Sequence, residues 1–493
     1  MAMLNITIPG DFITGTFSGD LMLFIIPINL VLVFAMIFWE RSNPQSTLLW
    51  LLVMLMFPPF GFILYLFFGQ TFYSKYAFKT KAQDDLRLRT ILKEQKMTLK
   101  RSHEDLEKDH PGSSEFMNII HNVSHSYSDD NEVELCTDGR MYFSKLFEDI
   151  RNAKETINFE SYIIRDDEIG EALVNLMTRK VEEGVEVRFM CDAFGFGKGP
   201  KKAVNRFIDA GGHFTLFHSR ATCFLSPRKN NRNHRKIIVI DGKIGWTGGH
   251  NIGKEYLGRG PLGHWRDASV RIAGSAVEGL QVRFLTDWRY ATKQDLTTEE
   301  GFYKDEKCDG DTVIQIISGG PDVTEQSPVH SQYMMLFTRC RKTLYIQTPY
   351  LVPDEASLSV LKLAALGGVD VRIMIPDKPD HPFVYWANLY YASRLMEAGV
   401  RVFHYKNGFV HSKTIVADSY YCSVGSANLD ERSMKLNFET NAMIYSHGLG
   451  KKLTDVFLRD LEYCTEYSLE EYKKLRFFDS FKISVCRLAA SQL

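Results

Sequence analysis

Two long apolar runs near the start of the chain are its clearest pattern. Residues 21–39 and 48–68 contain almost no charged side chains. Each run is long enough to cross the ~30 Å hydrocarbon layer of a bilayer as a helix. No Lys or Arg precedes the first run and a second run follows at once, so a cleaved signal peptide fits less well. Pro58 and Pro59 predict a kink in the second run. We expect a two-helix transmembrane hairpin within residues 1–70.

Positive charge is distributed unevenly around these runs. The connecting residues 40–47 contain one cation, Arg41, whereas nine Lys and Arg residues follow between positions 75 and 101. Because positive residues stay on the cytoplasmic side, both ends of the hairpin are predicted to be cytoplasmic. We expect residues 71–130 to form a basic helical linker, either solvated or lying along anionic lipid headgroups.

The pattern changes from about residue 131, where short apolar strands alternate with helices. Such alternation is typical of an α/β domain. A strand, a helix, a second strand and a second helix occur twice in that order, at residues 156–164, 169–183, 185–191 and 202–210, and again at 343–350, 358–366, 369–375 and 383–398. An internal duplication explains this repetition. The predicted fold class is α/β, with one repeat at 131–305 and another at 306–493, each a mostly β sheet flanked by helices.

Both repeats end in a similar segment. It reads HRKIIVIDGKIGWTGGHN from position 234 and HSKTIVADSYYCSVGSAN from position 411. Since side chains alternate along a strand, His234 and Lys236 share one face, as do His411 and Lys413. A single His-x-Lys match would be weak evidence, but two at equivalent places in a duplicated fold predict one shared active site.

Five other polar residues of these segments lie further along the chain from the His-Lys pairs. Asp241 and Asp418 lie seven residues after their histidines, an odd offset that directs them to the opposite face, at a tight turn. The chain then returns through GGHN and GSAN, which bring Asn251, Ser426 and Asn428 back beside the His-Lys pairs. We expect these three to bind substrate oxygens.

Two histidines and two lysines suit chemistry on a phosphodiester. One neutral imidazole can attack phosphorus while a second, protonated imidazole donates to the leaving oxygen. Lysine and asparagine side chains can hold the non-bridging oxygens. The sequence contains no HExxH, calcium-loop or P-loop pattern, so we expect neither a metal nor a cofactor. Asp267 and Glu439 each begin an apolar run downstream of their motif, and they are our candidates for orienting the histidines.

The composition of the chain argues against some classes of ligand. The 59 basic residues nearly balance the 60 acidic ones, so no bulk charge draws the chain to nucleic acid. Eight cysteines without a CxxC pair indicate neither a zinc site nor a disulfide framework. The oligomeric state stays open, with a homo-oligomer compatible with the sequence.

The paired motifs resemble the HKD motifs of the phospholipase D superfamily. TGGHNIGKEY from position 247, TPYLVPD from 348 and GSANLDERS from 425 resemble bacterial cardiolipin synthase in particular. The resemblance implies a pseudo-twofold catalytic unit that joins two phosphatidylglycerol molecules into cardiolipin and releases glycerol, without a metal. It also implies a phosphatidyl-histidine on His234, with His411 as acid and then base. The full motif set that it marks as catalytic is His234, Lys236, Asp241, His411, Lys413 and Asp418.

Three other functions share part of this pattern. A membrane-bound phospholipase D that hydrolyses lipids to phosphatidic acid would use the same catalytic residues. A nuclease of the superfamily is disfavoured by the apolar runs and the balanced charge. A non-catalytic membrane scaffold would not need the histidines. We therefore expect phosphatidylglycerol and membrane lipids as partners, and a two-span protein of the cell membrane with a cytoplasmic catalytic domain.

Overall fold

The computed structural model describes residues 19–39, 44–58, 60–68, 107–108, 110–124, 126–218, 231–297, 299–304, 308–322 and 327–489. The chain divides into two compact units, one of residues 1–77 with 225–228 and one of residues 78–224 with 229–493. Much of the predicted basic linker at 71–130 lies outside the described residues. The predicted domain boundaries stay a prediction.

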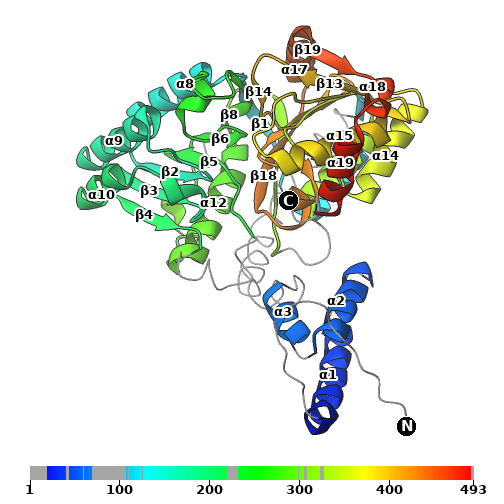
Figure 1. The fold of residues 1–493 in the computed structure, drawn as a ribbon. Coiled ribbons are helices and arrows are strands. Elements are labelled where there is room, and N and C mark those ends of the chain that lie inside the picture. Colours follow the sequence, from blue (N-terminus) through cyan, green and yellow to red (C-terminus); the bar gives the residue numbers. More distant parts are fainter. Residues whose placement is uncertain are drawn as a thin grey trace. The chain divides into compact units, whose positions relative to one another are not determined.

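The N-terminal unit contains helices α1 (Gly19–Trp39), α2 (Pro44–Met56) and α3 (Phe60–Phe68) (Figure 1). The second apolar run breaks near Pro58, because α2 ends before it and α3 begins after it. Buried Met36, Met54 and Tyr65 pack together among the three helices. In the described part of the chain, no helix combines the length and the apolar character needed to cross a membrane. The two predicted spans stay a prediction.

The larger unit is built on one 15-stranded sheet. Its first half contains β1 (Ser128–Cys136), β2 (Thr156–Ser161), β3 (Glu186–Cys191), β4 (His213–Leu216), β5 (Ile237–Ile240), β6 (Ile244–Gly248) and β8 (Ser269–Ala273). Its second half contains β9 (Thr312–Gly319), β10 (Thr343–Gln347), β12 (Asp370–Pro376), β13 (Arg401–Tyr405), β15 (Thr414–Ala417), β16 (Tyr421–Gly425), β18 (Glu439–Tyr445) and β19 (Cys464–Tyr467).

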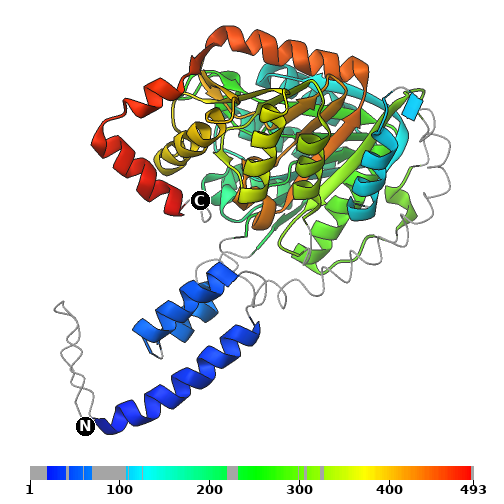
Figure 2. The same ribbon diagram turned by 90° about the vertical axis from the view of Figure 1, so that its right-hand side faces the viewer.

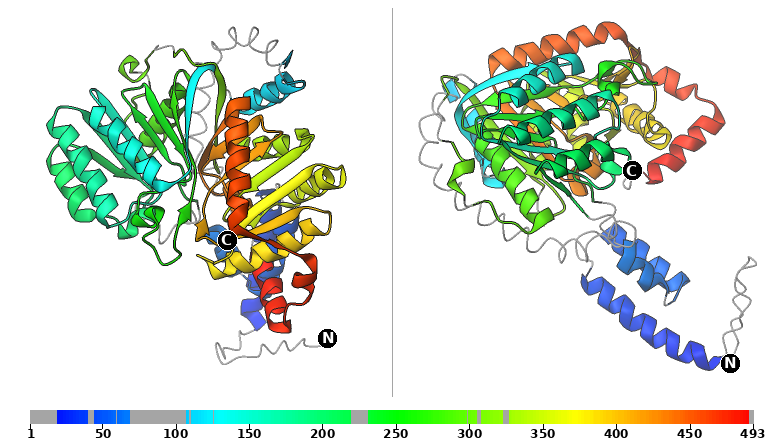
Figure 3. Two further views of the ribbon diagram at one scale, coloured as in Figure 1. Left: turned by 90° about the horizontal axis from the view of Figure 1, so that it is seen from above. Right: turned by 90° about the vertical axis from the view of Figure 1, so that its left-hand side faces the viewer.

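The two halves of the sheet have the same strand order. From the outside inward, the first half runs β4-β3-β2-β5-β6-β8-β1, and the second runs β13-β12-β10-β15-β16-β18-β9, with β19 added at its edge. The halves join where β1 pairs antiparallel with β9. The left view of Figure 3 shows the two halves side by side. The predicted α/β fold of two repeats is therefore confirmed.

Helices cover each half of the sheet and close two apolar cores. The first half has α8 (Gly139–Asn152), α9 (Glu168–Glu182), α10 (Lys201–Asp209) and α12 (Ala276–Thr292). The second has α7 (Ser113–Ser124), α13 (Pro328–Arg339), α14 (Glu355–Leu366), α15 (Pro382–Met396), α16 (Glu431–Lys435), α17 (His447–Asp460), α18 (Leu469–Lys473) and α19 (Phe477–Ala489), several of which lie in front of the strands in Figure 2. Phe159, Phe189 and Trp246 lie in one core and Leu344 and Ile373 in the other.

Short strands tie the halves together near the sequence motifs. Strand β7 (Trp265–Arg266) of the first repeat pairs in parallel with β14 (Phe409–Val410) of the second. Within the second repeat, β11 (Leu351–Val352) pairs with β17 (Leu429–Asp430). The first of these pairs places His411, which follows β14, directly against the first repeat.

Candidate active site

Each motif histidine is held by backbone of the opposite repeat. His234 precedes β5, and its N–H donates to the carbonyl of Phe438 over 2.9 Å. His411 precedes β15, and its N–H donates to the carbonyl of Arg266 over 2.8 Å. The two histidines are thus fixed at the interface between the repeats, just before β5 and β15 begin.

The carboxylates are paired with the histidines crosswise. Glu439 of the second repeat lies 2.9 Å from Nδ1 of His234, while Asp267 of the first repeat lies 2.6 Å from Nδ1 of His411. Both carboxylates are fully buried, at 0% exposure. A carboxylate at Nδ1 accepts a hydrogen bond, so the ring proton lies on Nδ1 and Nε2 presents its lone pair.

Further groups hold Glu439 in place. The hydroxyl of Ser426 donates to one of its oxygens, and Nδ2 of Asn437 donates to the other over 3.1 Å. Burial alone would raise the pKa of Glu439, but His234, Lys236 and the Ser426 hydroxyl lower it below its usual value. Glu439 is therefore a stable anion beside the first histidine.

The two lysines face the same region. Nζ of Lys236 donates to the carbonyl of His234 over 2.7 Å, and Nζ of Lys413 donates to the carbonyl of His411 and lies 2.8 Å from its Nδ1. Both side chains are buried, which lowers the pKa of Lys236 to about 7 and that of Lys413 to about 8. Buried ammonium groups of this kind gain most from a bound anion.

The four basic groups influence one another across the repeats. Burial, with smaller contributions from Lys236 and Lys413, lowers the pKa of His234 to about 4 against the opposing charge of Glu439. Burial, Lys413, Lys236 and His234 together hold the pKa of His411 well below its usual value. The lysine of each repeat therefore lowers the pKa of the histidine in the other repeat. The two motifs form one site, and its cations favour an anionic ligand.

The predicted oxygen-binding residues have other partners in this site. Asn251 donates from Nδ2 to the hydroxyl of Tyr256 over 2.9 Å. Asn428 donates to Asp430 over 3.1 Å, while its Oδ1 is buried with no partner among the described residues. Ser426 commits its hydroxyl proton to Glu439, so it supports that carboxylate rather than facing a substrate. Substrate binding by Asn251, Ser426 and Asn428 stays a prediction.

Asp241 and Asp418 lie at turns away from the histidines. The carboxylate of Asp241 accepts hydrogen bonds from the backbone N–H groups of residues 154–156, over 2.7 to 2.9 Å. Asp418 accepts the equivalent three from residues 341–343. Both have a φ of 53°, as their turn requires. Their oxygens are occupied by backbone at the start of β2 and β10, and their place in the catalytic set stays a prediction.

Three aromatic residues of the site were not singled out from the sequence. The ring of Tyr162 lies edge-on to His234 with centroids 4.9 Å apart. The hydroxyl of Tyr256 lies 3.4 Å from Nδ1 of His411, and the ring of Trp265 lies 5.3 Å from the same imidazole. Tyr256 ends the quoted segment at positions 247–256 and Trp265 lies two residues before Asp267, but nothing in their spacing distinguishes them from core aromatics.

Two related α/β halves that meet at paired His-Lys motifs define a phospholipase D-like protein. A family model described as "Cardiolipin synthase, PLD-like domain" matches residues 146–295 and 333–461. A second model, "Phospholipase_D-nuclease N-terminal", matches residues 28–70. The chain belongs to the cardiolipin synthase family of the phospholipase D superfamily.

Curated relatives cover nearly the whole chain. "Cardiolipin synthase" of Staphylococcus aureus (strain Mu50 / ATCC 700699) is 43% identical over 94% of this chain and 94% of its own length. "Cardiolipin synthase" of Clostridium perfringens (strain 13 / Type A) is 40% identical over 92% of this chain and 95% of its own length. The solved phosphatidylserine synthase of Haemophilus influenzae Rd KW20 is similar in fold, with a TM-score of 0.58 and 16% identity over 77% of this chain and 99% of its own.

Proposed function

We propose that this protein is a phosphatidyltransferase that makes cardiolipin and glycerol from two phosphatidylglycerol molecules. The observation that carries the proposal is the crossed arrangement of His234 with Glu439 and His411 with Asp267. Each histidine is oriented by the other repeat, so both imidazoles can act on one phosphorus. The family relatives named cardiolipin synthase supply the choice of reaction.

In the first step, Nε2 of His234 attacks the phosphorus of the first phosphatidylglycerol and the bond to its terminal glycerol breaks. His234 suits this role because its lowered pKa of about 4 leaves it neutral. Lys236 and Lys413 neutralise the phosphoryl oxygens. The anionic substrate in turn raises the pKa of His411, which allows that imidazole to carry the proton that it gives to the leaving glycerol.

In the second step, a hydroxyl of the second phosphatidylglycerol replaces the glycerol. His411, now neutral, takes the proton of that hydroxyl, whose oxygen attacks phosphorus as the bond to His234 breaks. The products are cardiolipin and a free His234. Asp267 and Glu439 fix the two tautomers throughout, and we assign them as positioning residues.

The N-terminal unit is proposed to anchor the enzyme in the cell membrane by a two-helix hairpin, with the catalytic domain cytoplasmic. Support comes from apolar side chains that face outward: Val31, Phe34 and Leu48 are 63–67% exposed. Exposed apolar surface of this kind is rare on water-facing helices and marks an interaction surface. Anchoring would keep lipid hydroxyls close to the site, which favours transfer over hydrolysis.

Product analysis tests the reaction. Full-length protein is incubated with vesicles of phosphatidylglycerol labelled in its terminal glycerol, and we expect equal amounts of cardiolipin and free glycerol. His234→Ala and His411→Ala should each lower turnover about a thousandfold or more, because the two groups act as a unit. His213→Ala, an exposed histidine at the start of β4, is the matched control.

Two outcomes would contradict the proposal. Phosphatidic acid and glycerol without cardiolipin would make the protein a hydrolase. Full activity of both alanine variants would mean that His234 and His411 have no catalytic role. Labelled phosphatidyl groups should also accumulate on His234 in the His411→Ala protein, and label on His411 instead would reverse the two assignments.

A further inference from the structure

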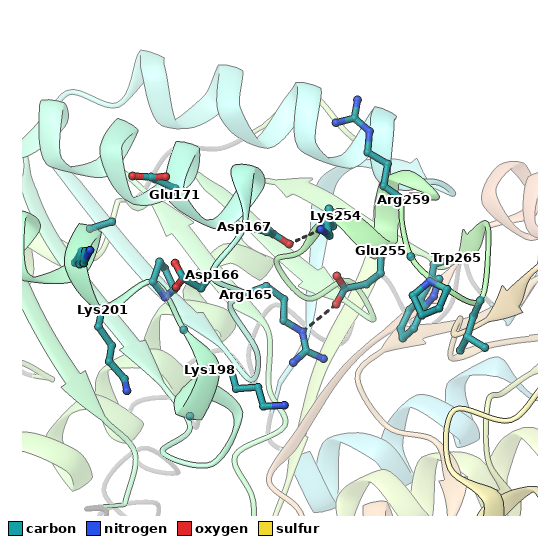
Figure 4. A pocket seen from close by; sticks show the side chains of 18 of the residues that line it. Arg165, Asp166, Asp167, Glu171, Lys198, Lys201, Lys254, Glu255, Arg259 and Trp265 are labelled. Carbon is teal, nitrogen blue, oxygen red and sulfur yellow. Dashed lines mark hydrogen bonds and ion pairs between the residues drawn. The ribbon is translucent and has the colours of Figure 1, made fainter.

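An open groove of about 1050 Å³ lies on the first repeat, outside the histidine pairs (Figure 4). It is formed by residues 165–167 after β2, the turn η2 (Gly195–Lys198), the start of α10 and the loop that contains η4 (Lys254–Leu257). Seven basic and four acidic side chains line it. The excess of cations makes the groove attractive to an anion, although the whole chain is nearly neutral.

Most of the acidic groups in the groove already have partners. Asp167 accepts from the backbone N–H groups that begin α9, and its second oxygen accepts from the N–H of Lys254 over 2.8 Å. Glu255 pairs with Arg165 over 3.2 Å, and Glu171 pairs with an arginine of α10 over the same distance. The two glutamates are therefore paired with arginines and form no ion pair with the lysines of the groove.

Four lysines of the groove are left without an ion pair in the described part of the chain: Lys198, Lys201, Lys202 and Lys254. All four are exposed. In Figure 4, Lys201 lies toward one side of the groove, and Glu255 and Trp265 lie toward the other. An anion in the groove would therefore meet several ammonium groups, with few carboxylates to repel it.

Trp265 and the η4 turn contribute to both the groove and the surroundings of His411. Trp265 lines the groove and lies 5.3 Å from the ring of His411. The η4 turn that brings Lys254 to the groove also brings Tyr256 within 3.4 Å of His411. A ligand with its anionic part in the groove could thus extend an attached hydroxyl toward His411.

We propose that this groove binds the phosphodiester of the acceptor phosphatidylglycerol. The inference rests on the proposed function and names the substrate group that the groove recognises. Two phosphodiesters cannot share one set of cations without repulsion, and the donor occupies Lys236 and Lys413. A second cationic site, which shares Trp265 with the surroundings of His411, holds the acceptor while its terminal hydroxyl reaches the base.

Two water-soluble acceptors separate this site from general membrane binding. The full-length protein transfers phosphatidyl groups from phosphatidylglycerol either to labelled glycerol or to labelled glycerophosphoglycerol, which keeps the phosphodiester but has no acyl chains. Each reaction releases one unlabelled glycerol for each labelled acceptor joined. The measured quantity is the ratio of kcat/KM for glycerophosphoglycerol to kcat/KM for glycerol.

We expect the double variant Lys198→Glu and Lys254→Glu to lower that ratio about tenfold, because two attractions become repulsions. The double variant Lys198→Arg and Lys254→Arg keeps both charges and should restore the ratio. Lys451→Glu with Lys452→Glu makes the same charge change on two exposed lysines of α17 and should leave the ratio as in the wild type. Glycerol transfer by each variant reports that its active site is folded.

Three results would overturn the assignment. An unchanged ratio in the first double variant, with cardiolipin still made by the wild type, removes the groove from acceptor binding and leaves the proposed function intact. Inorganic phosphate and unlabelled glycerophosphoglycerol can each be added to the transfer to labelled glycerol. Equal inhibition of that transfer by the two would assign the groove to a free phosphate ion. A wild type that makes no cardiolipin rejects the proposed function itself, together with this inference.

Discussion

Glu439 illustrates how one buried carboxylate sets the charge state of two neighbours. It lies 2.9 Å from Nδ1 of His234, and its negative charge raises the pKa of both His234 and Lys236 against the effect of burial. Without that charge, both groups would lose their protons more easily. The working pH range of the site therefore depends on a residue that does not touch the substrate.

The pH profile of kcat/KM should reveal this dependence. In the wild type, activity falls below about pH 4 as His234 gains a proton, and falls above about pH 7 as Lys236 loses its charge. Glu439→Gln removes the charge that raises both values, so both limbs should move to lower pH. We also expect turnover to drop about a hundredfold or more, because the imidazole loses its orienting anion.

Asp267→Asn is the matched variant in the other pair. Asp267 raises the pKa of Lys413 and Lys236, but it is not among the main influences on His234. In the pH profile of Asp267→Asn, the acidic limb should therefore stay at the wild-type pH, while the basic limb moves to lower pH. Equal displacement of the acidic limb in both variants would show that Glu439 does not act on His234 in particular.

At the level of elements, the turns after β5 and β15 link each motif to the strand beside it. Asp241 ties the turn to three N–H groups at the start of β2. Removing its carboxylate should destabilise the fold by about 1–3 kcal/mol, since hydrogen bonds to a charged group are lost. For Asp241→Ala we expect a lower Tm in thermal unfolding, with kcat per folded molecule close to the wild type.

The loss of stability should be specific to the aspartates of the two turns. Asp309→Ala removes an exposed aspartate and should leave Tm almost unchanged. Loss of turnover in Asp241→Ala without a change in Tm would instead support a catalytic role for the aspartate. Asp418→Ala should behave like Asp241→Ala, because Asp418 makes the equivalent hydrogen bonds in the second repeat.

The sequence predicted what depends on local pattern. Alternation along a strand was enough to separate Asp241 from His234, and repetition of short strands and helices was enough to predict two halves. The crossed pairing of Glu439 with His234 could not be predicted, because it depends on how strands of different repeats meet. Neither the bridge between Asn233 and Phe438 nor the pairing of β7 with β14 has a signal in a single sequence.

At the scale of the whole larger unit, the joined sheet explains why one site serves two repeats. Strands β1 and β9 pair at its centre, and β18 lies between β9 and β16. The first residue of β18 is Glu439, which thereby reaches the histidine of the other half. A repeat alone would contain a histidine without its carboxylate, so the site is a property of the assembled pair.

The ratio of transfer to hydrolysis should depend on the N-terminal unit as well as on the catalytic site. Where water can enter the site, a lipid hydroxyl competes with it only if its local concentration is high, which membrane anchoring would provide. A chain that lacks residues 1–77 retains the whole larger unit. On vesicles, its ratio of cardiolipin to phosphatidic acid should therefore be lower by about tenfold or more. With a dispersed short-chain phosphatidylglycerol, the truncated and full-length proteins should give the same ratio. A ratio that also stays equal on vesicles would mean that the catalytic site itself excludes water, and that the N-terminal unit has no part in selecting the acceptor.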